Sequence, residues 1–222
     1  MVKMGVTMTL HAALAELAMA IDSTQEERLL AFLDELLRWN QSINLTAITD
    51  RQEALVKHLV DSLTLLPYLR GDETLLDMGS GGGLPGLPLK MVLPGLNLTS
   101  VDAVAKKISF QKHIIRTFAL SGAVARHGRL EALGKEAALS SHFDLVVARA
   151  FASLPDCVRL ARPFLRSGGS LIAMKGPEGE KELLAAEELI SSAGFSIQSL
   201  DRLDLPGGNG ERTLIGLKLL SR

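Results

Sequence analysis

The chain has 222 residues, 47% hydrophobic and 22% charged, with a formal net charge of −1. This composition predicts a globular protein with a substantial core, and it differs from that of proteins that grip naked nucleic acid by its phosphates alone. The single cysteine, Cys157, excludes an internal disulfide framework and a cysteine-based zinc site. The low cysteine content indicates a reducing, cytoplasmic location, and we expect no metal. No apolar run is long enough to cross a bilayer, so we expect no membrane partner.

The first third of the chain has a helical pattern. An Ala- and Leu-rich helix is predicted over 9–20, and a capping box at Ser23–Glu26 predicts a second helix that runs to about Trp39. A polar loop over 40–49 precedes another capping box at Asp50–Glu53 and a helix that ends at Pro67. No strand is predicted before residue 73, so residues 1–70 are interpreted as an N-terminal helical extension.

From residue 71 onward the pattern alternates between strands and helices. Five apolar runs predict strands at 74–78, 97–101, 123–127, 143–148 and 169–174, with helices at 85–92, 104–120, 131–139 and 153–165 between them. After a helix from Glu180 to Ser192, strands at 195–203 and 212–219 predict a closing antiparallel hairpin. Residues 71–222 are therefore expected to form an α/β Rossmann-like domain with a seven-stranded, mostly parallel sheet.

A glycine-rich stretch, Leu75–Pro88, follows the first strand. Gly81, Gly83 and Gly86 fit the G-x-G-x-x-G dinucleotide fingerprint, whereas Gly79, Gly81 and Gly83 fit the D-x-G-x-G-x-G turn of S-adenosylmethionine-dependent methyltransferases. The closing hairpin favours the methyltransferase variant of this fold. An NAD-type oxidoreductase, or a nucleotide-binding module without catalysis, stays open as the alternative; thermal stabilisation by S-adenosylhomocysteine but not by NAD would separate them.

Polar residues at the carboxyl ends of the strands are the candidate ligand contacts, because ligands of such sheets bind at that edge. Asp102 is expected to accept bonds from ribose hydroxyls, and Leu130 with Glu131 to lie beside an adenine. Arg149 and Lys175 follow the fourth and fifth strands, and Lys175 is a candidate contact for RNA or the target base. Helix capping by Asp102, a dipole contact by Glu131 and rim positions for both cations are the structural alternatives.

Two further groups of residues lie outside this edge. His58, Asp61 and Ser62 share one helix face at i, i+3 and i+4 spacing, which is more typical of a local polar cluster than of a catalytic site. Basic residues also recur on two helices, which are either solvated faces or RNA contacts; they are Lys106, Lys107, Lys112 and Arg116 on one and Arg159, Arg162 and Arg166 on the other.

The motifs together resemble the ribosomal RNA small-subunit methyltransferase G family, also called glucose-inhibited division protein B. The resemblance covers nearly the whole chain and rests on these segments: Leu37–Asn40, Asn44–Thr46, His58–Ser62, Gly79–Pro88, Arg149–Ala152, Lys175–Gly176 and Glu211–Arg212. It implies a class I methyltransferase sheet, S-adenosyl-L-methionine as cofactor, and N7-methylguanine in small-subunit (16S) rRNA as product. The expected partner is therefore small-subunit RNA and not DNA. Because the basic patches are modest on a nearly neutral protein, we expect this RNA to be bound as a ribonucleoprotein, and we expect the enzyme to be a monomer.

The resemblance further implies a set of cofactor contacts, to which the motif adds Gly81. They are Gly79, Leu84, Asp102, Ala103, Val104, Leu130, Glu131 and Arg149. Two of these depart from the family pattern, since Ser is common where Ala103 stands and Ala where Leu130 stands. The departures matter little if backbone groups make these contacts.

The expected chemistry needs no catalytic base. Guanine N7 has a free lone pair and no proton to lose, so orientation and electrostatics suffice. Amine methyltransferases commonly carry an Asn/Asp-Pro-Pro-aromatic turn where this chain has Arg149-Ala150-Phe151, and cytosine-C5 enzymes need a cysteine nucleophile, whereas Cys157 is predicted inside a helix.

Overall fold

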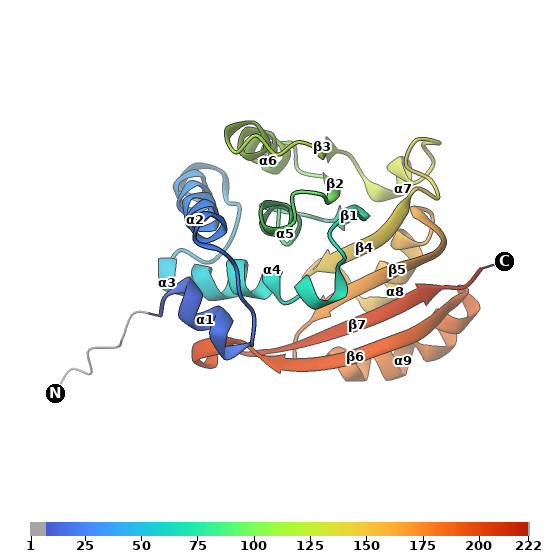
Figure 1. Ribbon diagram of the computed structural model, residues 1–222. Coiled ribbons are helices and arrows are strands. Elements are labelled where there is room, and N and C mark those ends of the chain that lie inside the picture. Colours follow the sequence, from blue (N-terminus) through green and yellow to red (C-terminus); the bar gives the residue numbers. More distant parts are fainter. Residues whose placement is uncertain (1–7, 222) are drawn as a thin grey trace.

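A seven-stranded mixed sheet forms the centre of the molecule in the computed structural model, which describes residues 8–221 (Figure 1). Its strand order is β3-β2-β1-β4-β5-β7-β6; β1 to β5 are parallel, and β7 runs antiparallel to both of its neighbours. The strands are β1 (Thr74–Met78), β2 (Asn97–Asp102), β3 (Ala123–His127), β4 (Phe143–Arg149), β5 (Leu165–Lys175), β6 (Phe195–Asp204) and β7 (Glu211–Leu219). This strand order confirms the predicted fold class. The sequence order of the strands reverses between β1 and β4, although these two strands are parallel.

Helices cover both faces of the sheet (Figure 1). The helices are α1 (Leu10–Glu16), α2 (Ser23–Ile43), α3 (Arg51–Ala54), α4 (Asp61–Leu63), α5 (Gly86–Val92), α6 (Ala105–Thr117), α7 (Leu130–Leu133), α8 (Leu154–Ala161) and α9 (Gly179–Ser192). A π-helical segment, Leu55–Val60, joins α3 to α4, and 3₁₀ turns lie at Leu66–Tyr68 and Pro206–Gly208. None of the helices in the described residues is long and apolar enough to span a membrane.

Strand alternation divides the apolar side chains between two cores. Leu75 and Val147 point to a core shared with α1, α2, α5 and α6, whereas Leu76 and Val146 point to a core shared with α8 and α9. Successive strand residues face opposite sides of a sheet, so each apolar run contributes to both cores. This explains why the strands read as continuous apolar segments in the sequence.

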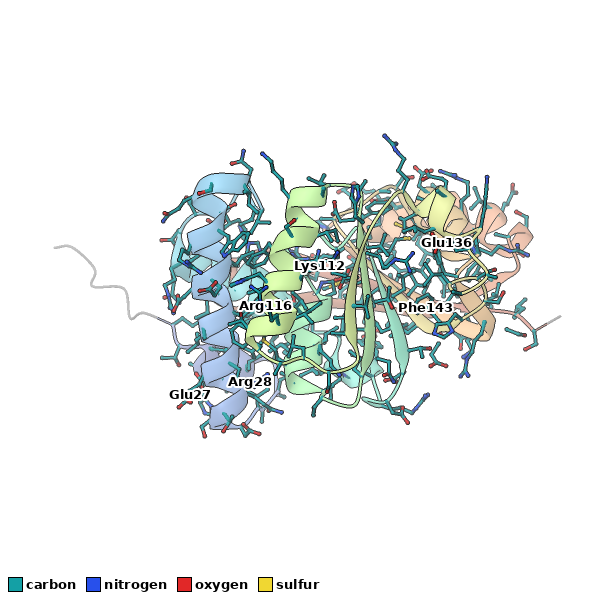
Figure 2. All side chains as sticks on the ribbon, turned by 90° about the horizontal axis from the view of Figure 1, so that it is seen from above. Glu27, Arg28, Lys112, Arg116, Glu136 and Phe143 are labelled. Atoms are coloured by element: carbon teal, nitrogen blue, oxygen red, sulfur yellow. The ribbon has the colours of Figure 1, made fainter. Side chains whose placement is uncertain are left out.

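The N-terminal helices pack directly on the rest of the chain. Figure 2 shows α2 beside α6, which in turn lies on the sheet. Phe32 of α2 and Phe110 of α6 are fully buried in the same core, with ring centroids 6.2 Å apart. The division into 1–70 and 71–222 remains a prediction, and its first seven residues lie outside those that the structure describes.

Helix boundaries differ from the predictions in several places. The capping box of α2 is formed by Asp22 and Gln25, not by Ser23 and Glu26, and α2 continues to Ile43, through the first part of the predicted loop. In this position the Gln25 side chain also donates to Val92 O of α5 (3.0 Å). The Glu26 side chain accepts from His11 N of α1, so both residues join α2 to a neighbouring helix. The helix predicted at 131–139 is only the short α7.

Candidate functional site

The glycine-rich turn follows β1 and leads into α5. Gly79, Gly81 and Gly83 have φ values of 71°, 55° and 80°, a region that residues with a Cβ rarely adopt. At the start of α5, Gly86 N donates to Asp77 Oδ2 (2.9 Å), and a Cβ at Gly86 would lie only 2.7 Å from that oxygen. The glycines are therefore required by both the backbone conformation and the close packing of the turn.

Asp77 is completely buried beneath this turn. Burial raises the pKa of its carboxyl group to about 7; the bond from Gly86 and the charge of Arg149 lower it, and the charge of Asp102 raises it further. Its second oxygen, Oδ1, has no hydrogen-bond partner among the described residues. A protonated Asp77 is thus a substantial part of the population near neutral pH.

Asp102 at the end of β2 connects the turn to the next helix. Its Oδ2 accepts from Gly81 N (2.9 Å) and its Oδ1 accepts from Val104 N (2.8 Å), the residue before α6. This second bond is an Asx turn ahead of α6 and not a helix cap, because Val104 is the N-cap residue and no side chain caps the helix; the capping alternative is wrong. Since each carboxylate oxygen has two lone-pair sites, both oxygens retain capacity for a ligand.

A cavity of about 380 Å³, which we name the Asp102 cavity, lies at the carboxyl ends of β1 to β3. Five of the predicted contact residues line it, namely Gly79, Asp102, Ala103, Leu130 and Glu131. The volume falls within the range of small-molecule sites. A buried carboxylate suits ribose hydroxyls and Leu130 offers an apolar wall for an adenine, so the residues present fit an adenosyl cofactor.

The other predicted contacts lie near this cavity or beyond it. Gly81 and Val104 bind Asp102 through their backbone, and Leu84 is buried in the glycine-rich turn. Arg149 instead lines the neighbouring cavity described below. No cluster of His, Cys, Asp and Glu suited to a metal ion occurs within residues 8–221.

Phe151 was not among the predicted contacts, although it lies directly on the glycine-rich turn. Its ring also lines the Asp102 cavity, and a Cβ at Gly79 would be 2.0 Å from its Cδ2 atom. The ring remains 37% exposed, and the preceding residue, Ala150, has a φ of 47°. An aromatic residue in the turn after β4 was the available sequence signal, but only the fold places that turn against Gly79.

Asp61 binds two arginines across the molecule. Its side chain is fully buried; Oδ2 accepts from Arg149 Nη1 (3.1 Å) and Oδ1 accepts from Arg212 Nε (2.7 Å). Arg149 also donates to Lys57 O (2.8 Å). The cluster predicted on the 58–62 helix face is therefore the centre of an ion network that joins this helix to β4 and β7.

These groups line a second cavity of about 520 Å³, which we name the Arg212 cavity. One of its walls is His58, whose Nδ1 lies 3.1 Å from Lys57 O and whose Nε2 lies 2.9 Å from the Thr46 hydroxyl. A carbonyl can only accept, so Nδ1 carries the proton and Nε2 accepts from Thr46. Burial lowers the pKa of His58 to about 4, and the charge of Arg149 lowers it too, so the ring is neutral near pH 7.

Lys175 is held inside the protein. Its ammonium group donates to Ala152 O (2.6 Å) and pairs with Glu182 (2.7 Å), and its side chain is only 10% exposed. Glu182 in turn accepts from Leu154 N (3.0 Å) at the start of α8. Lys175 thus fixes the turn that carries Phe151.

The two predicted basic helices differ in how far their charges are engaged. The second predicted helix does not hold its three arginines together, because α8 ends at Ala161, so that only Arg159 lies within it, Arg162 follows it and Arg166 lies in β5. Arg159 pairs with Asp156, Arg162 donates to Ala193 O, and Arg166 pairs with Asp144. On α6, the side chains of Lys106, Lys112 and Arg116 are exposed and form no ion pair within residues 8–221. Figure 2 shows Lys112 and Arg116 along α6. The face of α6 is therefore the more available of the two.

The chain is similar in sequence to known proteins over nearly its whole length. The family model described as rRNA small subunit methyltransferase G matches residues 25–212. The chain is 49% identical to the ribosomal RNA small subunit methyltransferase G of Syntrophotalea carbinolica, over 94% of this chain and 96% of that protein. It is 38% identical to the protein of the same description from Neisseria meningitidis serogroup C, again over 94% and 96%.

Solved structures with low sequence identity share the fold. A methyltransferase from Aquifex aeolicus, described as dependent on S-adenosylmethionine, gives a TM-score of 0.57 at 14% identity, covering 75% of this chain and 93% of that one. Fibrillarin from Aeropyrum pernix, described as a complex with natively bound S-adenosyl-L-methionine, gives a TM-score of 0.56 at 17% identity, covering 72% and 73%. These likenesses confirm the Rossmann-like fold.

Proposed function

Because the chain belongs to the ribosomal RNA small subunit methyltransferase G family, and is therefore an S-adenosylmethionine-dependent methyltransferase of small-subunit rRNA, we propose that the atom it methylates is N7 of a guanine. The NAD-type alternative finds no support among these relatives. The cofactor supplies a methyl group that is already bound to a sulfonium leaving group. What this chain must add is the position of the acceptor atom.

The cofactor contacts are proposed for the Asp102 cavity. There Asp102 would accept from the ribose hydroxyls while it holds Gly81 and Val104, and Leu130 would pack against the adenine with Glu131 beside it. Leu84 and Ala103 would contribute through the backbone. Arg149 lies on the Arg212 cavity in this structure, so its contact with the cofactor would have to be made across the turn at Ala150.

The observation that carries the N7 assignment is the state of the ionisable groups in the Arg212 cavity. Its two carboxylates are each bound to cations, Asp61 to Arg149 and Arg212, and Glu182 to Lys175. His58 accepts from Thr46 and has a pKa of about 4. No group that lines this cavity is placed as a free base, which suits guanine N7, because its lone pair attacks without losing a proton.

The substrate is proposed to be a small-subunit ribonucleoprotein in the cytoplasm rather than naked RNA, and the enzyme a monomer. The net charge of −1 is low for a protein that holds RNA by its phosphates alone. The α6 face offers only a modest cationic surface, so the particle would supply part of the recognition.

A single experiment tests the product. Small subunits from cells that lack this protein are incubated with the enzyme and S-adenosylmethionine, and the RNA is then treated with borohydride and aniline, which cleave at N7-methylguanine. We expect cleavage at one guanine and a rate at saturating substrates that is nearly flat across neutral pH. Recovery of the methyl group in adenine or cytosine would overturn the assignment.

A further inference from the structure

A third cavity lies at the opposite edge of the sheet from the Asp102 and Arg212 cavities. It is formed where β4 and β5 begin and β7 ends, close to the C-terminus in Figure 1. We name it the Lys218 cavity; its volume is about 250 Å³. Because β5 has 11 residues, a rise of about 3.3 Å per residue separates the two edges by roughly 30 Å. Neither the cofactor contacts nor the proposed methyl transfer uses this cavity.

Three cationic side chains line the Lys218 cavity, namely Arg70, Arg166 and Lys218. Lys218 is half-buried, and its ammonium group forms no ion pair within residues 8–221. Arg166 pairs with Asp144 through Nη2, and Arg70 approaches neighbouring carboxylates only through Nε, at 3.4 Å and 4.0 Å. Since a guanidinium has five N–H donors, both arginines retain donors for a ligand.

The two carboxylates of the cavity are already bound by the protein. Glu73 is buried; its Oε1 accepts from Arg70 N (2.6 Å) and its Oε2 accepts from Gly71 N (2.9 Å). Asp144 Oδ2 accepts from both the amide and the hydroxyl of Thr74 (2.8 Å each), while its Oδ1 makes the ion pair described above. The three cations therefore exceed the two carboxylates, and the free donors belong to the cations.

The floor of the cavity combines hydroxyl groups with apolar surface. A Cβ at Gly216 would lie 2.6 Å from Ser199 Oγ, so the glycine leaves room for this hydroxyl over β7. Ser170 of β5 adds a second hydroxyl. Leu145 and Ile172 line the cavity between these polar groups. Hydroxyls and cations together are the side-chain donors that phosphate oxygens accept from.

From these contacts we infer that the Lys218 cavity binds the phosphate group of a small phosphorylated molecule, such as glycerol phosphate. A phosphomonoester carries nearly two negative charges at neutral pH and three acceptor oxygens, which match the three cations and two hydroxyls. A carboxylate has one charge and two oxygens, and would leave part of these donors unused. The volume is below that of sites for drug-sized ligands, which favours a ligand of few atoms over a segment of RNA.

Titration calorimetry at constant ionic strength tests this site with inorganic phosphate and glycerol phosphate, and with acetate as the singly charged comparison. We expect both phosphates to bind the parent protein, and acetate to bind at least tenfold more weakly. Lys218→Met should lower the affinity for both phosphates at least tenfold, because a charge-assisted bond is lost. Lys135→Met, which changes an exposed lysine outside the three cavities, should bind them as the parent does. Arg70→Gln, on an exposed side chain, replaces Lys218→Met should that variant unfold.

Three results would contradict the inference. One is the absence of phosphate binding by the parent, or equal binding by Lys218→Met and Lys135→Met. Another is acetate binding as tight as that of phosphate, which would exclude phosphate as the ligand class. The third concerns the rRNA as a source of phosphate: Lys218→Met should keep the parent's salt slope in particle binding, and a smaller slope would mean that RNA occupies the cavity instead. None of these measurements depends on which atom is methylated, so the N7 assignment is tested separately.

Discussion

Asp102 is proposed to combine a structural and a cofactor-binding role in one carboxylate. It ties the glycine-rich turn to the start of α6 through Gly81 and Val104, and it is only 8% exposed at the edge of the cavity that bears its name. A bond to a charged group contributes about 1.5–3 kcal/mol. Its removal should therefore affect the cofactor more than it affects the fold.

We expect Asp102→Ala to weaken binding of S-adenosylhomocysteine roughly tenfold or more, since about 1.4 kcal/mol corresponds to a factor of ten. Titration calorimetry measures the affinity, and circular dichroism checks that the variant is folded. Asp204→Ala, which removes an exposed carboxylate at the end of β6, is the matched control. Unchanged affinity in Asp102→Ala would remove this residue from the proposed contacts.

For Lys175, the role predicted from the sequence differs from the role that its contacts in the structure indicate. As an RNA contact it should be accessible, but its ammonium group is bound to Ala152 O and Glu182. We expect Lys175→Met to lower kcat by loosening the turn that carries Phe151, with little change in the salt dependence of particle binding. Lys175→Arg should recover part of the rate. A smaller salt slope in Lys175→Met would instead favour a phosphate contact.

At the scale of elements, the start of α2 illustrates what sequence can and cannot settle. Ser23–Glu26 and Asp22–Gln25 are overlapping capping boxes that the sequence pattern alone does not separate. The structure uses Asp22, whose Oδ1 accepts from Gln25 N (2.8 Å), while Gln25 Oε1 accepts from Asp22 N (2.9 Å). The deciding contact, from Gln25 to Val92 O, joins residues 67 positions apart.

Loss of this cap should be measurable. Asp22→Ala is expected to lower the free energy of unfolding by about 1 kcal/mol, within a usual range of roughly 0.5–2. Urea titration measures it, and Glu188→Ala, on the exposed face of α9, is the control. Ser23→Ala should have the smaller effect of the two N-terminal substitutions; the reverse order would mean that the box predicted from the sequence is the one used in solution.

In the sheet and the site, too, some features follow from local sequence and others depend on contacts between distant residues. Strand positions, the glycine-rich turn and Asp102 follow from local patterns, because turns and buried strands need particular residue types. The Arg212 cavity brings together Thr46, His58, Arg149 and Arg212 from four separate segments. No local sequence pattern predicts that these residues lie together in the fold. The π-helical segment Leu55–Val60, which contains His58 and precedes Asp61, was also not predicted.

At the scale of the whole molecule, we expect RNA binding to depend more on the exposed cations of α6 than on the net charge. Lys112 and Arg116 are exposed on the same helix face (Figure 2). If each neutralises one RNA phosphate, the double substitution Lys112→Ala and Arg116→Ala should reduce the slope of log K against log salt by about 1.4–1.8. Arg159→Ala with Arg166→Ala, on the engaged cations, is the control. Equal slopes for the parent and the α6 variant would mean that this face does not contact RNA.

Two buried groups also shape how the stability of the whole molecule depends on pH. Asp77 has a pKa near 7 in the folded protein and about 3.9 when unfolded, so the folded state retains its proton between these values and stability falls as pH rises. His58 has a pKa near 4 when folded and about 6.5 when unfolded, so the unfolded state gains a proton below 6.5 and stability falls as pH drops. Between pH 4.5 and 6 the two contributions oppose each other.

In the parent protein, the contributions of Asp77 and His58 to the pH dependence of the free energy of unfolding nearly cancel in this range. We therefore expect a substitution of either residue to reveal the contribution of the other. Asp77→Asn should make the free energy of unfolding increase with pH between about 5 and 6, relative to the parent, by up to about 1.4 kcal/mol per pH unit, and His58→Gln should make it decrease by a similar amount. Urea titrations at pH 5, 5.5 and 6 measure the slopes, so an overall loss of stability in either variant does not obscure the result. A parent-like slope in Asp77→Asn would mean that Asp77 is ionised throughout this range, and a parent-like slope in His58→Gln would mean that the buried ring accepts a proton as readily as it does in the unfolded chain.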